Sequence, residues 1–233
     1  MTHSQSAHWE YTLNEWNSDT HQKNLDIIFN DKINVIYDIG ANVGCTTNIF
    51  LEYAKSKSLN LPKIYCFEPD KDNINFLKNK FENEINEGLI IPIEIGIYYG
   101  LKEAKAFGMG FITEKKIHPN VGGMGIEECM KKVEKKRIEN GEDVFCGQVD
   151  NKVFKLDTLE NVSKNFEVPD FIKIDIEGAE KNILENSELL KKAKYMIVEW
   201  NQEEDFCDFL KKNLPNFKII NNNSDYLIKN MDF

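Results

Sequence analysis

One turn constrains the fold of this chain more than any other feature: residues 38–44, which read Asp-Ile-Gly-Ala-Asn-Val-Gly. The turn follows a β-branched run at 33–39 and precedes a stretch at 43–57 with helical spacing, so the sequence predicts a strand, a tight turn and a helix. Gly40 and Gly44 have no Cβ, which lets the backbone pass close to a ligand. In open α/β sheets, ligands bind outside the carboxyl ends of the strands. We therefore expect a nucleotide to lie at this turn.

The alternation of strands and helices continues along the chain. A short apolar run at 63–67 ends at Pro69, Asp70 is placed to cap the next helix, and 89–98 reads as a third strand. Because strands alternate with helices, we expect a parallel sheet of seven strands covered on both faces. The remaining strands are expected at 171–175, 195–200, 217–220 and 226–228, separated by helices at 179–192 and 203–213.

Two segments do not follow this alternation of strands and helices. Residues 1–30 are polar and aromatic with a weak helical signal at 25–29, and we expect them to form a lead-in or a lid over the site. The rest of the chain, 31–233, is expected to be a single domain with an insertion at 108–150. Glycines crowd the start of the insertion and predict a loop, and helical spacing follows at 126–140. The insertion is either a solvated surface excursion or a lid that shapes the substrate site.

Composition narrows the possible partners. Lys and Arg total 29 against 39 Asp and Glu, a formal charge of −10, whereas proteins that bind phosphate backbones usually carry the opposite sign. Nucleic acid is therefore not an expected partner. No run approaches the ~20 apolar residues that cross a bilayer, and the 5 cysteines show no CxxC spacing. We expect a cytoplasmic protein without membrane insertion or structural metal, and the sequence leaves its oligomeric state open.

A second signal lies at the tip of the second expected strand, where Glu68 precedes Pro69. A carboxylate there accepts hydrogen bonds from both hydroxyls of a ribose, in dinucleotide enzymes and methyltransferases alike. The two classes differ at the glycine turn, because a pyrophosphate needs GxGxxG at the helix N-terminus, whereas this turn carries Asp38 two residues before Gly40. A carboxylate favours a cationic group such as the amino group of a methionine moiety.

A third signal reads Lys-Ile-Asp-Ile-Glu-Gly-Ala-Glu at 173–180, where a middle strand ends and the next helix begins. Lys173, Asp175 and Glu177 bring ionisable side chains to the carboxyl edge of the sheet. Glu199 adds another carboxylate at the end of the neighbouring strand. Acidic groups are therefore expected around the pocket.

Together, the motifs DIGANVG, FEP at 67–69, KIDIEGAE and VEW at 198–200 resemble the FkbM family of class I methyltransferases over about residues 33–200. The resemblance implies a Rossmann-like, doubly wound α/β sheet of seven strands in the order 3-2-1-4-5-7-6, with strand 7 antiparallel. It also implies S-adenosylmethionine as cofactor and O-methylation of a sugar, glycan or natural-product hydroxyl. The residues implied to bind the cofactor are Asp38, Gly40, Ala41, Asn42, Gly44, Glu68 and Pro69.

Methylation of a hydroxyl group needs a base, because the protonated oxygen is a poor nucleophile. We expect Asp175 to be that base or to orient the acceptor, with Glu177 and then Glu199 as alternatives and Lys173 stabilising their ionised forms. Capping of the helix N-terminus is the open alternative for Asp175 and Glu177. A divalent metal held by this pair is chemically possible, but no third ligand is evident and no metal is predicted.

Two other functions remain open at this point. An NAD-dependent oxidoreductase or epimerase shares the architecture, but the chain has no GxGxxG turn. A catalytically silent binding module would be expected to lack the cofactor carboxylates, yet Asp38 and Glu68 are both present. Where the family often has alanine after the third strand, this chain reads Gly-Ile-Tyr-Tyr-Gly at 96–100, so no adenine contact is assigned.

Overall fold

The computed structural model describes residues 3–107, 110–113, 116–118, 149–176, 178–200, 202, 204–222 and 225–233, and of these the side chains outside 3–8 and 105–152. Its main sheet has seven strands. They are β1 Val35–Ile39, β2 Lys63–Glu68, β3 Ile90–Glu94, β9 Phe171–Ile174, β10 Tyr195–Val198, β11 Phe217–Asn222 and β12 Tyr226–Asn230.

The strands of this sheet lie in the order β3-β2-β1-β9-β10-β12-β11. Counted along the chain within the sheet, this order is 3-2-1-4-5-7-6, as the resemblance implies. The strands from β3 to β10 pair in parallel, and β12 runs antiparallel to both β10 and β11. The strand order reverses between β1 and β9, which makes this the switch point where ligands of such sheets bind. The doubly wound α/β class is confirmed.

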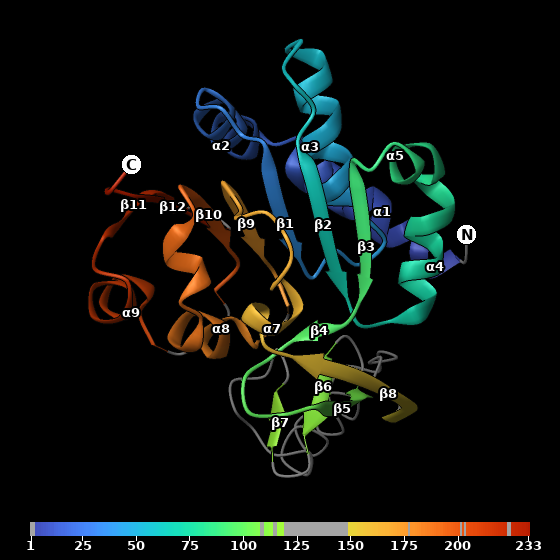
Figure 1. Cartoon of the computed structure of the whole chain (residues 1–233). Coiled ribbons are helices and arrows are strands. Elements are labelled where there is room, and N and C mark those ends of the chain that lie inside the picture. The colour runs from blue at the N-terminus through green and yellow to red at the C-terminus, as the bar shows by residue number, and fades with distance from the viewer. Residues whose placement is uncertain are drawn as a thin grey trace, which may run out of the picture.

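Helices cover both faces of the main sheet (Figure 1). One face is covered by α1 His3–Trp16, α2 Asp19–Phe29, α3 Cys45–Ser56, α4 Lys71–Lys80 and α5 Glu82–Asn86. The other is covered by α7 Leu159–Val162, α8 Glu180–Asn186, the 3-10 helix Leu189–Lys192 and α9 Phe206–Asn213. The arrows of β1, β2 and β3 all point toward β4, so the carboxyl edge of the sheet lies on that side (Figure 1).

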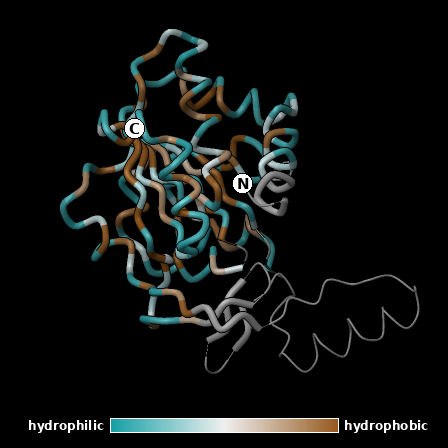
Figure 2. The backbone as a smooth tube through the Cα atoms, turned by 90° about the vertical axis from the view of Figure 1, so that its right-hand side faces the viewer, coloured by the Kyte–Doolittle hydropathy of each residue, from teal (hydrophilic) through white to brown (hydrophobic). Residues whose placement is uncertain are grey.

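The central strands bury both faces, and successive side chains divide between the two cores. Ile36 of β1 joins the cluster under α2 and α3, whereas Val35 and Tyr37 join the cluster on the opposite face. Phe171 and Ile172 of β9 divide in the same way. Figure 2 shows hydrophobic residues concentrated along these strands. Each such side chain contributes roughly 1.5–3 kcal/mol when it is fully buried, which explains why this sheet is readable in the sequence.

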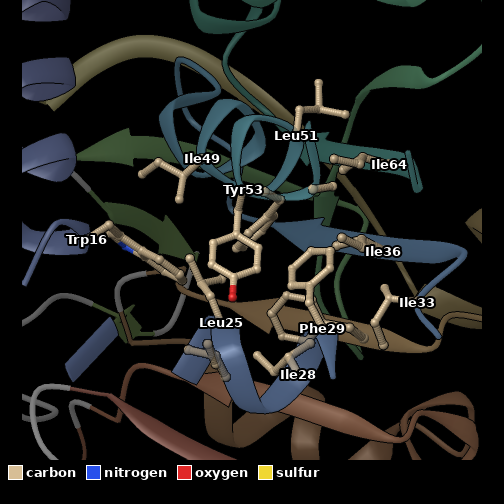
Figure 3. Packing of buried hydrophobic residues seen from close by; sticks show 14 of the residues in the cluster. Trp16, Leu25, Ile28, Phe29, Ile33, Ile36, Ile49, Leu51, Tyr53 and Ile64 are labelled. Carbon is tan, nitrogen blue, oxygen red and sulfur yellow. The ribbon is translucent and has the colours of Figure 1, made fainter. Parts of the chain in front are cut away.

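The first thirty residues form two helices that pack on the sheet. Ser18 caps α2, because its side chain accepts a hydrogen bond from the amide of His21. Leu25, Ile28 and Phe29 are buried beside α3 and β1 (Figure 3). The segment is therefore part of the core, which the weak helical signal did not reveal. Its expected role as a lead-in or lid stays a prediction.

A second sheet has the order β4-β8-β5-β6-β7. The single strand expected at 89–98 is wrong, because the chain leaves the main sheet after β3 and pairs with β8 instead. A Cβ on Gly96 would stand 2.6 Å from Leu156 Cδ2, so glycine allows this close pairing. The bounds of the five strands are β4 Gly96–Ile97, β5 Glu103–Phe107, β6 Gly110–Thr113, β7 Lys116–His118 and β8 Val149–Asp157.

The glycines at the start of the predicted insertion predict a loop, but β6 and β7 lie there instead. The strands β6 and β7 have 4 and 3 residues, too few for a period of two to stand out among glycines and lysines. The helix predicted at 126–140 lies outside the described residues. The proposed boundary of the insertion, 108–150, and its role in shaping the substrate site stay predictions.

Candidate active site

The glycine turn follows β1 at the carboxyl edge of the sheet. Gly40 has a φ of +81°, and a Cβ on it would stand 1.8 Å from the carbonyl oxygen of Asp175. Gly44 caps α3 with a φ of +82°, and a Cβ there would stand 2.8 Å from Cε2 of Phe81. Contacts within the protein thus require both glycines. The expectation that glycine lets the backbone of this turn pass close to a ligand stays a prediction.

Ala41 and Asn42, which follow Gly40, connect the turn to β2 by hydrogen bonds. The amide of Ala41 donates to the carbonyl of Phe67 at 3.1 Å, and the Ala41 side chain is buried in the core beside α3. Asn42 adopts a φ of +49°, and its amide donates to Oε2 of Glu68 at 3.0 Å. The shape of the turn therefore depends directly on the carboxyl group that ends the second strand.

Asp38 is the innermost group of the site and is fully buried. Its Oδ2 accepts hydrogen bonds from the hydroxyls of Thr46 at 2.8 Å and Thr47 at 2.7 Å. Its Oδ1 lies 3.4 Å from the ammonium of Lys173, which is also buried. Asp38 thus binds groups of the protein, and its expected contact with a cofactor stays a proposal.

The ammonium of Lys173 connects three parts of the site. It donates to the carbonyl of Gly40 at 2.8 Å and lies 3.1 Å from Oδ2 of Asp175 as well as near Asp38. Burial by itself lowers the pKa of Lys173, but the Asp175 and Asp38 carboxylates raise it above its ordinary value. Lys173 therefore stays an ammonium and fixes the turn after β1 to the end of β9.

Carboxylates follow two neighbouring strands, as expected. Asp175 follows β9, and its side chain is 39% exposed, so it is the part of the Lys173 cluster that faces outward. Glu199 follows β10, and its amide donates to the carbonyl of Ile174 at 3.0 Å, which sets it beside the end of β9. Glu177 lies outside the described residues. The structure thus brings Lys173, Asp175 and Glu199 to one edge.

Glu68 ends β2 and is 7% exposed. Besides the Asn42 amide, it receives the amide of Asp70 at 2.8 Å and the side chain of Asn73 at 3.4 Å, both on Oε1. Burial raises the pKa of Glu68 to about 7, against the effect of these hydrogen bonds. Pro69 follows directly and lies next to Gly96 of β4. A carboxylate that accepts one hydrogen bond on Oε2 and two on Oε1 thus ends the second strand, where the sequence predicts it.

Glu180 shapes the loop that carries Asp175, a role the sequence suggests only as capping. It is fully buried, and its Oε1 accepts the amides of Ile176 at 3.2 Å and Gly178 at 2.9 Å. Gln202 bridges Gly178 and Glu180 from the loop after β10, at 3.2 and 3.4 Å. Burial raises the pKa of Glu180 to about 7. The position of Gln202 had no signal in the sequence, because only the fold brings it to this loop.

Metal-binding clusters and membrane-spanning helices are two further features to consider in the described part of the chain. No group of three or more metal-ligating side chains is found among the described residues, so the structure offers no support for the divalent metal. Where helices are described, none is long and apolar enough to cross a membrane.

The strand order, the glycine turn after the first strand and the carboxylate after the second define a Rossmann-like, doubly wound fold with a candidate ligand site at the carboxyl edge of its sheet. The sequence profile of the Methyltransferase FkbM domain matches residues 38–222. The chain belongs to this family. Membership favours methyl transfer over the NAD-dependent alternative.

One solved structure agrees with this chain in fold. Methyltransferase FkbM from Methylobacillus flagellatus matches with a TM-score of 0.50 and 13% identity, over 85% of this chain and 43% of that one. This chain therefore spans less than half the length of that relative. A methyltransferase from Geobacter sulfurreducens matches with a TM-score of 0.47 and 10% identity, over 98% and 89% of the two chains. At such identities the likeness concerns the fold alone. A search of curated proteins found no match.

Proposed function

We propose that this chain transfers a methyl group from S-adenosylmethionine to a hydroxyl oxygen of a sugar, glycan or natural product. The position of Lys173 carries this proposal. One ammonium contacts Gly40 of the glycine turn, buried Asp38 and half-exposed Asp175. The turn that would cradle the cofactor and the carboxylate that would face the acceptor are therefore held by the same side chain.

The end of β2 suits the ribose of the cofactor. A carboxylate has about four acceptor positions. Oε2 of Glu68 receives the Asn42 amide, and Oε1 receives the Asp70 amide and the Asn73 side chain, which leaves about one position, on Oε2, for a ribose hydroxyl. Pro69 fixes the chain direction directly after this carboxylate. Glu68 would thus hold the ribose while Asn42 couples it to the glycine turn.

The charge of the inner cluster suits a cationic cofactor. Asp38 and Asp175 carry two negative charges when ionised and Lys173 carries one positive charge, so the cluster has a net charge of −1. When bound, S-adenosylmethionine supplies a methyl group activated by a positively charged sulfur. Asp38 would support its methionine end by neutralising Lys173 and by anchoring the turn through Thr46 and Thr47. Backbone groups of residues 40–44 would make the direct contacts.

Asp175 is the proposed base. Its side chain is partly exposed and lies 3.1 Å from the ammonium of Lys173, and a general base must be within reach of the proton that it takes. S-adenosylmethionine would supply the methyl group, and an oxygen of Asp175 would take the proton that the acceptor hydroxyl loses. Much of the rate would come from alignment of the reacting atoms. Glu199 and Glu177 are the alternative bases.

The net charge and the cysteines bear on the partners and the location of the protein. The net charge of −10 supports an acceptor other than nucleic acid. The described cysteines, Cys45, Cys66 and Cys207, are free thiols, which is consistent with a cytoplasmic location. We infer that the insertion at 108–150 helps to select the acceptor, since long segments outside the regular fold often serve this purpose.

Calorimetric titration with S-adenosylhomocysteine, with NAD as the control ligand, tests the cofactor without knowledge of the acceptor. Micromolar affinity for S-adenosylhomocysteine alone is expected. Labelled S-adenosylmethionine incubated with free hexoses, hexosamines and phenolic natural products then tests the acceptor class. Binding of NAD alone, or of neither ligand, would contradict the proposed cofactor and favour the oxidoreductase or the silent module.

A further inference from the structure

A hydrogen bond joins the beginning of α2 to the residue before β12. Nε2 of His21 lies 3.0 Å from Oδ2 of Asp225, and the two side chains are only 2% and 11% exposed. The other ring nitrogen, Nδ1, lies 3.1 Å from the carbonyl oxygen of Glu15 and 3.0 Å from the hydroxyl of Ser18. His21 therefore fixes both the end of α1 and the start of α2 to the C-terminal hairpin.

The hairpin places this pair at the carboxyl edge of the sheet. Tyr226, the first residue of β12, pairs with Val198, the last residue of β10. Because β12 is antiparallel to β10, Asp225 comes just before the strand at the edge where Glu199 follows β10. The segment at 15–21, which we name the α1–α2 corner, is thus held at the edge that carries the proposed base.

The corner itself is rigidly packed. Trp16 is 3% exposed, its ring lies 4.7 Å from that of His21, and it meets Phe50 of α3 edge-on at 5.4 Å. A buried tryptophan beside the His21–Asp225 contact removes most freedom from the last turn of α1. Glu15, directly before it, is only half-buried, so its side chain lies at the boundary between the core and the edge.

Glu15 lies at this edge of the sheet, because its main-chain carbonyl oxygen is 3.1 Å from Nδ1 of His21, which contacts Asp225. Burial raises the pKa of its carboxyl, Asp225 and Asp175 raise it further, and His21 and Lys173 oppose this. Asp175 and Lys173 therefore affect the pKa of Glu15, although Lys173 belongs to β9, Asp175 follows it and Glu15 lies on α1. In the sheet, β9, β10 and β12 lie on one side of β1, and β2 with Glu68 lies on the other. Glu15 is thus on the side away from the proposed ribose site.

We propose that the α1–α2 corner is the acceptor-side wall of the active site, that Glu15 binds the acceptor, and that the His21–Asp225 pair is the clasp that holds this wall in place. The inference rests on the proposed function and extends it, since it names a residue that selects the acceptor. A carboxylate at this position accepts hydrogen bonds from hydroxyl or amino groups of a sugar-like compound next to Asp175.

The first test needs no acceptor. Carbon-13 NMR titration of the Glu15 carboxyl in the full chain should show a lower pKa in Asp175→Asn than in the wild type, because a neighbouring negative charge is lost. His21→Ala should reduce this difference, because the wall is no longer held. Asp208→Asn, which changes an exposed carboxylate on α9, serves as the control and should leave the titration unchanged. An unchanged Glu15 titration in Asp175→Asn would overturn the proposed wall.

The second test compares Glu15→Ala with Glu10→Ala, a change on the exposed surface of the same helix. The acceptor is whichever compound of the hexose, hexosamine and phenol set the wild type methylates. Glu15→Ala should raise its KM about tenfold, the loss of one charge-assisted hydrogen bond, while the affinity for S-adenosylhomocysteine stays within threefold. Glu10→Ala should change neither. An unchanged KM in Glu15→Ala refutes a role for Glu15 in acceptor binding.

The two proposals fail in different ways. A wild type that binds no S-adenosylhomocysteine overturns the proposed function, and the wall loses its acceptor with it. If the wild type binds S-adenosylhomocysteine but the pKa of Glu15 is unchanged in Asp175→Asn, the proposed function stands and only the proposed wall is overturned.

Discussion

Cofactor affinity should depend on pH through Glu68. Burial raises the pKa of Glu68 to about 7 in the cofactor-free chain. Ribose hydroxyls donate to the ionised carboxylate, so binding selects that form and displaces a proton. If only the ionised form binds, the apparent Kd is multiplied by 1 + 10^(7 − pH), which is about 11 at pH 6 and about 1.1 at pH 8. Affinity for S-adenosylhomocysteine should therefore rise about tenfold between pH 6 and pH 8.

Calorimetry at several pH values, in two buffers of different ionisation enthalpy, measures both the affinity and the proton released, which should be about half a proton at pH 7. Glu68→Gln should weaken binding at pH 8 by more than tenfold and flatten the part of the pH dependence that Glu68 causes. Glu94→Gln is the matched control. Glu94 is exposed, and it is the residue of β3 that pairs with Glu68 of β2. The amino group of the ligand titrates identically with each variant. A pH profile in Glu68→Gln that equals the wild-type profile would refute the reasoning.

Three further changes test the inner cluster. Asp175→Asn should lower methyl transfer by at least about a hundredfold while the affinity for S-adenosylhomocysteine stays within threefold, and full turnover would remove Asp175 as the base. Lys173→Met leaves Asp38 buried beside an apolar chain, so urea unfolding should show a loss of about 3–5 kcal/mol, and unchanged stability would contradict the ion pair. Gly40→Ala should destabilise the chain far more than Gly88→Ala in calorimetric scans, because a Cβ meets a carbonyl 1.8 Å away at Gly40 and nothing within 4 Å at Gly88, although both have positive φ. Equal losses would show that backbone conformation alone sets the effect.

The sequence predicts the main sheet because its strands are buried on both faces. Val35–Ile39 and Tyr195–Val198 are buried at every position and, apart from Asp38, read as apolar runs bounded by polar residues. The second sheet does not have this signal. Four of its five strands have at most 5 residues, and Gly96 pairs with Leu156, so local periodicity gives no reason for the chain to leave the main sheet after β3.

The site was predictable where single motifs supply it. Glu68, Asp175 and Glu199 lie at strand ends, as expected, because strand ends are readable. The internal roles of Asp38 and Gly40 were not readable, since they depend on Lys173 and on the end of β9, more than 130 residues away. The position of α1 has the same cause: nothing near Glu15 and His21 in the sequence indicates that Asp225 will be the partner of His21.

The His21–Asp225 contact joins residues 204 positions apart. Closing so long a loop costs much chain entropy, so the contact becomes favourable only after the intervening strands have brought its ends together. The glycine turn and Glu68, by contrast, belong to consecutive strands near the start of the sheet. A refolding chain should therefore gain the ability to bind the cofactor before β12 docks, and should gain the ability to discriminate between acceptors only at the last step.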